Sequence, residues 1–193
     1  MIDKNVSLIE KDVRQKRDNR IFSVLFFIVM WVLLLSMVFN TFIYSSIYVD
    51  GDSMYPTLCN GDIVKVNKTL RPTYGDVVII KKEKINVVKR VVAMGGDSVK
   101  LKDGDVYIKK SGEEDYSLLV ESYLGDEVRT SPDAWTEIYV PIGCVLYFGD
   151  NRIVSEDSRT NGYCNINDVI GVVEPWIIKT KNVRTWFFNV FGI

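Results

Sequence analysis

Hydrophobic and polar positions divide the chain into two parts of different character. Residues 1–20 are polar and carry charges of both signs, and no charged residue occurs from Ile21 to Val49. This apolar run is longer than the roughly 20 residues that a helix needs to cross a bilayer. We therefore expect a polar segment at 1–20, followed by one transmembrane helix over 21–48.

The charges that flank the apolar run predict its orientation. The next basic residue beyond the run is Lys65, whereas four basic residues precede it closely: Arg14, Lys16, Arg17 and Arg20. Because basic residues stay on the cytoplasmic side, we expect 1–20 in the cytoplasm and 49–193 outside it. A cleaved signal peptide is an alternative, but its apolar region spans about 7–15 residues and ends at a small-x-small site. A buried helix of a soluble protein is another, although the remaining chain is too small to surround it.

Beyond the apolar run, short β-rich segments alternate with turns. These segments are 63–66, 77–80, 87–93, 98–101, 105–108, 137–140, 145–148 and 168–173. Gly-Asp pairs separate several of them, and no helical pattern lies between them. We therefore expect a mostly β fold of antiparallel sheet over 49–193. The stretch 111–138 is more polar and irregular, and it predicts a smaller lobe, about 98–138, inserted into a core of about 49–97 and 139–180.

Missing residue types exclude several classes of site. The chain has no histidine, which excludes Ser-His-Asp and Cys-His catalysis and histidine-ligated metals. A hydrolase must then use lysine or a carboxylate as its base. The net charge of −1 gives no reason to expect a nucleic acid partner. No metal or other cofactor is expected, since the acidic triplet 113–115 lacks the alternate spacing of a calcium loop and predicts a solvated turn.

Two features stay open from the sequence alone. Three cysteines without Cys-x-x-Cys spacing indicate neither a zinc site nor a disulfide framework, but a single Cys144–Cys164 disulfide is an alternative. The aromatic stretch 186–193 is too short to cross a membrane. Its side chains suit either the bilayer interface or packing against the sheet.

Three polar segments carry the candidate chemistry. Ser53 lies between Gly51, which permits unusual backbone angles, and Pro56, which restricts them, so we expect it on a shaped loop. Lys89 belongs to a predicted strand and has valines on its own face, where burial would lower its pKa and favour the neutral amine. The alternative is an edge strand with the ammonium group in water. The third segment, 149–162, concentrates polar side chains between apolar strands, where they must satisfy one another.

Four blocks in this order, behind an apolar helix, resemble the bacterial type I signal peptidases (leader peptidases). They are Gly51-Asp52-Ser53-Met54-Tyr55-Pro56-Thr57-Leu58, then Gly61-Asp62-Ile63-Val64, then Lys89-Arg90-Val91-Val92-Ala93 with Gly95-Gly96-Asp97, then Gly149-Asp150-Asn151-Arg152 with Ser155, Asp157-Ser158-Arg159 and Gly162. The resemblance spans most of the chain. It implies an antiparallel β catalytic domain with an inserted lobe, tethered by one span in the bacterial cell membrane.

The resemblance also implies a role for each matching residue. Ser53 would be the nucleophile and Lys89 the general base of a Ser-Lys dyad that removes signal peptides from secretory preproteins through an acyl-enzyme. Ser155 matches a serine that hydrogen-bonds to the lysine amine and orients it. Gly51 departs from family members that place a serine there to stabilise the oxyanion. Asp157 and Arg159 match an ion pair that supports the site. Asp150 and Arg90 fall at positions associated with the integrity of the site.

The family's substrate binds as an extended strand, with small residues such as alanine at the first and third positions before the cut. The expected partners are therefore signal peptides and the lipid bilayer. Four residues near the catalytic pair in sequence are expected to line the substrate pockets: Val49, Met54, Leu58 and Val88.

Two other functions are compatible with parts of the sequence. A self-cleaving Ser-Lys repressor resembles the catalytic half, but such proteins carry a DNA-binding domain where this chain carries an apolar run. A membrane-tethered β-domain that holds a partner, or an inactive paralogue, is the non-enzymatic alternative. The distance between the Ser53 and Lys89 side chains distinguishes an enzyme from these non-enzymatic alternatives.

Overall fold

The computed structural model describes residues 2–83, 85–125, 128–131 and 135–174. The chain separates into two compact units, which meet between Ile43 and Tyr44. The first unit is one helix and the second holds all the strands, so each is described by itself.

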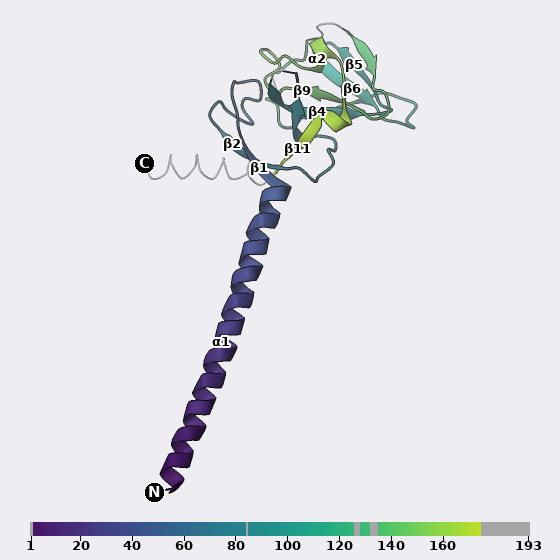
Figure 1. Cartoon of the computed structure of the whole chain (residues 1–193). Helices are drawn as coiled ribbons and strands as arrows, with labels where there is room; N and C mark the ends of the chain where they lie inside the picture. Colours follow the sequence, from purple (N-terminus) through teal and green to yellow (C-terminus); the bar gives the residue numbers. More distant parts are fainter. Residues whose placement is uncertain (1, 84, 126–127, 132–134, 175–193) are drawn as a thin grey trace. The chain divides into compact units, whose positions relative to one another are not determined.

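The first unit is the single continuous helix α1 (Ile2–Ile43) (Figure 1). Its part from Arg14 to Ile43 is long and apolar enough to cross a membrane, with a mean hydropathy of 2.8 in its most apolar window. Three polar side chains in that part, those of Ser23, Asn40 and Thr41, donate to backbone carbonyls four residues earlier. For example, Ser23 Oγ donates to the carbonyl of Asn19 at 2.9 Å. Such internal bonds suit an environment without water.

The helix differs from the expected one at both ends. It includes residues 2–20, whose helicity the sequence did not predict. It stops at Ile43, and residues 44–48, expected to belong to the transmembrane helix, form strand β1 (Tyr44–Tyr48) instead. The absence of charge marks an apolar run but does not distinguish a helix from a strand. Tyr-Ser-Ser-Ile-Tyr has strand-forming residues, and it pairs with the following strand along its whole length.

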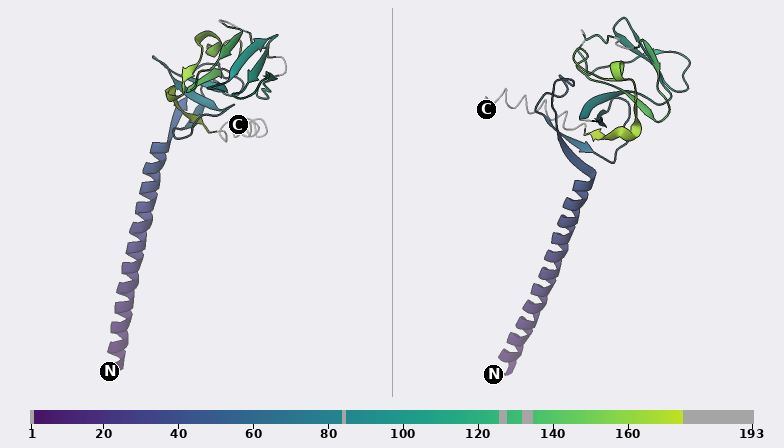
Figure 2. Two further views of the ribbon diagram at one scale, coloured as in Figure 1. Left: turned by 90° about the vertical axis from the view of Figure 1, so that its right-hand side faces the viewer. Right: turned by 45° about the horizontal axis from the view of Figure 1, so that its top comes forward.

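The second unit contains two antiparallel sheets, which can be followed in Figure 2. The larger sheet has the order β1, β2 (Ile63–Asn67), β11 (Val169–Val173), β3 (Val77–Lys81), β4 (Asn86–Met94), β9 (Cys144–Phe148) and β10 (Cys164–Asn165). The smaller sheet has the order β7 (Ser117–Leu118), β6 (Asp105–Lys109), β5 (Ser98–Lys102) and β8 (Glu137–Tyr139). Two short helices, α2 (Ser158–Asn161) and the 3₁₀ helix η1 (Ile166–Asp168), lie between β9 and β11. The expected mostly β, antiparallel fold is confirmed.

Strand β4 runs through the centre of this unit and joins its three apolar clusters. Its Val88 packs against the cluster that contains Met54 and Ile79, whereas its Val91 belongs to a cluster with Tyr147. Farther along, a register shift after Val91 turns the strand toward a third cluster, formed with the smaller sheet. Residues 89 and 90, between these contacts, are therefore held by packing on both sides.

Several minor expectations can also be assessed. The acidic triplet 113–115 is exposed beside a turn, as predicted. Cys59, Cys144 and Cys164 are free thiols, so the alternative disulfide is not formed in this structure. The aromatic stretch 186–193 lies outside the described residues.

Candidate active site

Ser53 lies on a loop that is closed at its base by backbone hydrogen bonds. Val49 N donates to the carbonyl of Asp62 at 2.8 Å, and Gly61 N donates to the carbonyl of Val49 at 2.9 Å. The buried side chain of Met54 anchors the loop in the apolar cluster. Gly51 has a φ of +93°, a backbone conformation that side chains other than glycine rarely adopt. The loop therefore has a defined shape with Ser53 half-buried on it.

Lys89 is buried on β4 rather than solvated at an edge. Its exposed fraction is 3%, and the strand residue opposite it is Val78 on β3. Its Nζ atom lies 2.7 Å from Ser53 Oγ. Burial lowers the pKa of Lys89 below its ordinary value, against the opposing effect of nearby carboxylates, first that of Asp157. The side chain is therefore biased toward the neutral amine that can accept a proton.

The loop that follows β9 closes over the backbone of Ser53. Asn151 N donates to the carbonyl oxygen of Ser53 at 3.0 Å. A Cβ atom at Gly149 would overlap the Ser155 side chain and would lie 2.5 Å from that same carbonyl oxygen. The close approach of the two loops thus requires glycine at position 149 for space alone.

Arg90 and Asp150 form a buried bidentate ion pair. Arg90 Nε lies 2.8 Å from Asp150 Oδ1, and Nη2 lies 2.6 Å from Oδ2. The third guanidinium nitrogen donates to the carbonyl of Gly75 at 2.7 Å. Arg90 follows Lys89 on β4, and Asp150 precedes Asn151, which bonds to the backbone of Ser53. This ion pair therefore fixes β4 against the loop that follows β9.

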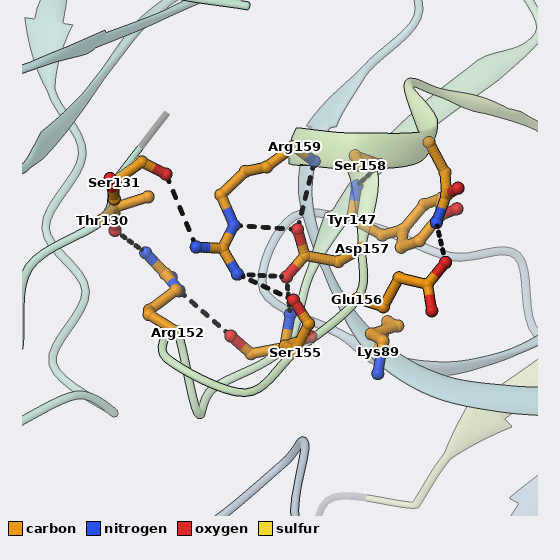
Figure 3. Close-up of polar contacts among 12 residues, drawn as sticks. Lys89, Thr130, Ser131, Tyr147, Arg152, Ser155, Glu156, Asp157, Ser158 and Arg159 are labelled. Atoms are coloured by element: carbon orange, nitrogen blue, oxygen red, sulfur yellow. Dashed lines mark hydrogen bonds and ion pairs between the residues drawn. The ribbon is translucent and has the colours of Figure 1, made fainter. Parts of the chain in front are cut away.

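Asp157 and Arg159 form a second buried pair, shown in Figure 3. Arg159 Nε donates to Asp157 Oδ1 at 2.9 Å and Nη2 donates to Oδ2 at 3.0 Å. The Asp157 carboxylate also accepts from Arg159 N at the start of α2 and from Gly149 N at 2.9 Å. It therefore caps the helix and holds Gly149, the first residue of the loop that follows β9.

Ser155 departs from its expected contact. Its hydroxyl is buried and has no hydrogen-bond partner, so it does not bond to the amine of Lys89. The hydroxyl instead occupies the space that a Cβ atom on Gly149 would fill. The backbone of Ser155 is well fixed, since its N donates to Asn151 and its carbonyl accepts from Arg159. The position of Ser155 in the sequence motif predicts that it lies at the site, but it does not predict the rotamer of its side chain.

Three of the four expected substrate-binding residues share one hollow of about 230 Å³ with Ser53 and Lys89. Val49, Met54 and Val88 line it beside Ser53 and Lys89.

Leu58 does not line this hollow. It is 2% exposed and belongs to the apolar cluster beneath the loop. Its N donates to the carbonyl of Met54 at 2.9 Å, and this helical turn directs its side chain inward.

Other residues of the site were not predicted. Arg152 lies in a recognised block, yet its buried ion pair with Glu121 had no signal in the sequence. Tyr123 lies with its ring 3.9 Å from the guanidinium of Arg90. Glu121 and Tyr123 belong to the polar stretch between β7 and β8, where neither spacing nor composition indicated a contact with the site.

Comparisons with known proteins show which family this chain resembles along most of its length. Residues 21–177 match the family described as signal peptidase, peptidase S26. The chain is 32% identical over 161 residues to signal peptidase I of Bacillus caldolyticus, covering 78% of this chain and 84% of that protein. It is 32% identical over 184 residues to signal peptidase IB of Staphylococcus aureus strain COL, covering 85% and 92%. A crystal structure of a signal peptidase I from Enterococcus faecalis V583 aligns with a TM-score of 0.45 and 25% identity over 54% of this chain and 98% of that one. By the extent of the family match and the identity to these relatives, the chain belongs to the signal peptidase I family of serine-type peptidases, peptidase S26.

Proposed function

We propose that this protein cleaves signal peptides from secretory preproteins with Ser53 as nucleophile and Lys89 as general base. The observation that carries the proposal is the 2.7 Å separation of Ser53 Oγ from the buried Nζ of Lys89. Membership of the signal peptidase I family supports the substrate class. A base is required because a serine hydroxyl is a weak nucleophile at its own pKa.

The proposed reaction is acyl transfer in two stages. Neutral Lys89 takes the proton of Ser53 as Oγ attacks the scissile carbonyl carbon. The tetrahedral intermediate collapses when Lys89 returns that proton to the departing amine, which leaves the signal peptide as an ester on Ser53. Lys89 then takes a proton from a water molecule, the resulting hydroxide attacks the ester carbonyl, and Ser53 recovers its proton.

The oxyanion of each intermediate needs donors that are in place beforehand. The backbone N–H of Ser53 is the donor that the nucleophile itself supplies. Gly51 has no hydroxyl to add a second one. A Cβ atom there would meet open space, but φ is +93°. This backbone conformation accounts for glycine at a position where some family members have serine.

The supporting residues act on the shape of the site. The ion pair of Asp150 with Arg90 holds the loop that follows β9 to β4. The pair of Asp157 with Arg159 holds the first residue of that loop and the start of α2. Ser155 contributes through its fixed backbone and through the space that its hydroxyl occupies beside Gly149.

The substrate strand is proposed to bind beside the first half of β4. This strand pairs with β9 only from Arg90 onward, so among the described residues Asn86–Lys89 have a strand partner on one side alone. The hollow lined by Val49, Met54 and Val88 lies at this edge. Main-chain pairing would supply affinity, and a small apolar hollow would admit alanine and exclude large side chains.

We also propose that the enzyme is anchored in the membrane with its catalytic unit outside the cytoplasm. The basic residues before the apolar stretch support this orientation. The proposal places residues 1–20 inside, the span from residue 21 to the end of α1 in the bilayer, and 49–193 outside. Ser53 follows the last helical residue, Ile43, by ten residues. That short link would keep the nucleophile near the bilayer surface, where the apolar part of a signal peptide ends.

The proposal is tested by incubating the detergent-solubilised full chain with a secretory precursor. Wild type should trim the precursor once, after a small-x-small site, whereas Ser53→Ala and Lys89→Ala should each leave it intact. Cleavage by Ser53→Ala at the wild-type rate would rule out the dyad. Both variants should unfold cooperatively, which excludes misfolding as the cause of inactivity.

A further inference from the structure

The polar segment between β7 and β8 contacts two arginines, Arg90 and Arg152, that bind the loop following β9. The Tyr123 ring lies 3.9 Å from the guanidinium of Arg90, and the Tyr123 hydroxyl donates to Glu121 Oε1 at 2.5 Å. Glu121 in turn accepts from both Nη atoms of Arg152. Glu121 and Tyr123 therefore contact the side chains of Arg90 and Arg152 and one another.

These two arginines hold the first two residues of the loop that follows β9 and covers the backbone of Ser53. Arg90 binds Asp150 bidentately, while Arg152 Nε donates to the carbonyl of Gly149 at 3.1 Å. The next residue along the loop is Asn151, whose N donates to the carbonyl of Ser53. A shift of either arginine would thus move the group that bonds to the backbone of the nucleophile.

The charges in this arrangement balance only when the polar segment is present. The Asp150 carboxylate compensates Arg90, and the Glu121 carboxylate compensates Arg152. The exposed fractions of the Arg152 and Glu121 side chains are 1% and 10%, so this pair is shielded from water. A buried arginine without its carboxylate is strongly unfavourable and would adopt another position. Arg152 also bonds to Thr130, in the same segment between β7 and β8, which adds a second attachment.

Tyr123 contributes rigidity rather than charge. An aromatic face over a guanidinium is favourable and restricts the plane of the arginine. Burial and then the Glu121 charge raise the pKa of Tyr123, so its hydroxyl stays protonated and donates to Glu121. Arg90 is thus held on one side by Asp150 and on its face by Tyr123.

We propose that Glu121 and Tyr123 are positioning residues, which align Ser53 with Lys89 by bracing Arg90 and Arg152. The proposal rests on the proposed dyad and deepens it. It assigns part of the catalytic alignment to a segment outside the recognised blocks. Neither residue lines the hollow beside Ser53, so neither is expected to contact substrate.

The test compares Tyr123→Leu, Tyr123→Phe and Glu121→Gln in the full-length protein with a fluorogenic signal-peptide substrate. Misalignment of reacting groups lowers the rate more than the affinity, so Tyr123→Leu should reduce kcat by about ten- to a hundredfold with KM little changed. Tyr123→Phe keeps the ring over Arg90 and should stay within about threefold of wild type, because the stacking contact survives. Glu121→Gln should also lower kcat without raising KM.

Leu119→Ala is the matched control, since Leu119 lies in the same segment but packs against the apolar cluster of the smaller sheet. It should lower Tm at least as much as Tyr123→Leu while keeping wild-type kcat at a temperature where all variants are folded. Equal kcat losses in the two variants at matched Tm would reduce Tyr123 to a structural residue and overturn the proposal. So would a Tyr123→Leu variant with raised KM and unchanged kcat, or a Tyr123→Phe variant as slow as Tyr123→Leu.

Ser53→Ala is assayed beside these variants. If it is inactive while Tyr123→Leu and Glu121→Gln match wild type, the positioning role fails and the dyad stands. If Ser53→Ala cleaves normally, the dyad itself fails.

Discussion

The Nζ atom of Lys89 lies 2.7 Å from the Oγ atom of Ser53, although the two residues are 36 positions apart in the chain. Lys89 comes from strand β4 and Ser53 from the loop between β1 and β2. Lys89 as a whole is 3% exposed, and the serine hydroxyl is the hydrogen-bond partner of its amine. This single contact has consequences for the pH dependence of both activity and stability.

Activity should rise with pH as Lys89 loses its proton. Burial lowers the pKa of Lys89 below 10.5, so the neutral base appears at a lower pH than for a solvated lysine. A profile of kcat/KM against pH should therefore increase through a midpoint below 10.5. Lys89→Arg should be inactive at every pH because its guanidinium remains charged. A rate independent of pH over this range would contradict lysine as the base.

Replacing Lys89 should stabilise the fold at neutral pH. In the window between the lowered pKa of the folded state and 10.5, the unfolded chain binds more protons than the folded one, so stability rises with pH. Below that window both states are protonated and the folded protein bears the full cost of the buried charge. Lys89→Met should therefore have a higher Tm than wild type at neutral pH. That difference should shrink as pH rises through the window, and a constant difference would argue against a buried, shifted lysine.

Gly149→Ala should lower the rate of cleavage by roughly a hundredfold through a steric effect. A methyl group there would overlap Ser155 and crowd the carbonyl of Ser53, which moves the nucleophile away from its base. Misplacement by about 1 Å can cost roughly a hundredfold in rate. The control is Gly125→Ala, since a Cβ atom at Gly125 would make only an ordinary contact of 3.8 Å with Val128. Precursor cleavage by both variants measures the effect, and equal activity would show that the loops separate readily.

Asp157→Asn should destabilise the protein far more than a comparable change at the surface. Removing one partner of a buried ion pair costs about 3–5 kcal/mol of the free energy of unfolding, because the other charge is left uncompensated. Glu137→Gln is the comparison, since its pair with Lys100 is about half exposed and exposed pairs contribute little. Denaturant unfolding of the two variants should differ in midpoint accordingly. Similar midpoints would mean that Arg159 finds another partner or water.

Local patterns in the sequence predict much of the fold. The strands expected at 77–80 and 87–93 are found as β3 and β4, and most of their residues are buried. The same local information does not extend to the end of the apolar run. Tyr44–Tyr48 lacks charge like the helix before it, and its pairing with β2 decides that it is a strand.

For the candidate site, too, the sequence predicts some features and the tertiary structure determines others. The lack of histidine and the four ordered blocks are enough by themselves to single out Ser53 and Lys89. The sequence alone could not place the Ser155 hydroxyl beside Gly149, turn Leu58 into the core, or bring Tyr123 onto Arg90. A sequence pattern determines which face of its own element a side chain occupies. Rotamers and contacts between distant segments depend on how those elements pack, and only the tertiary structure specifies that packing.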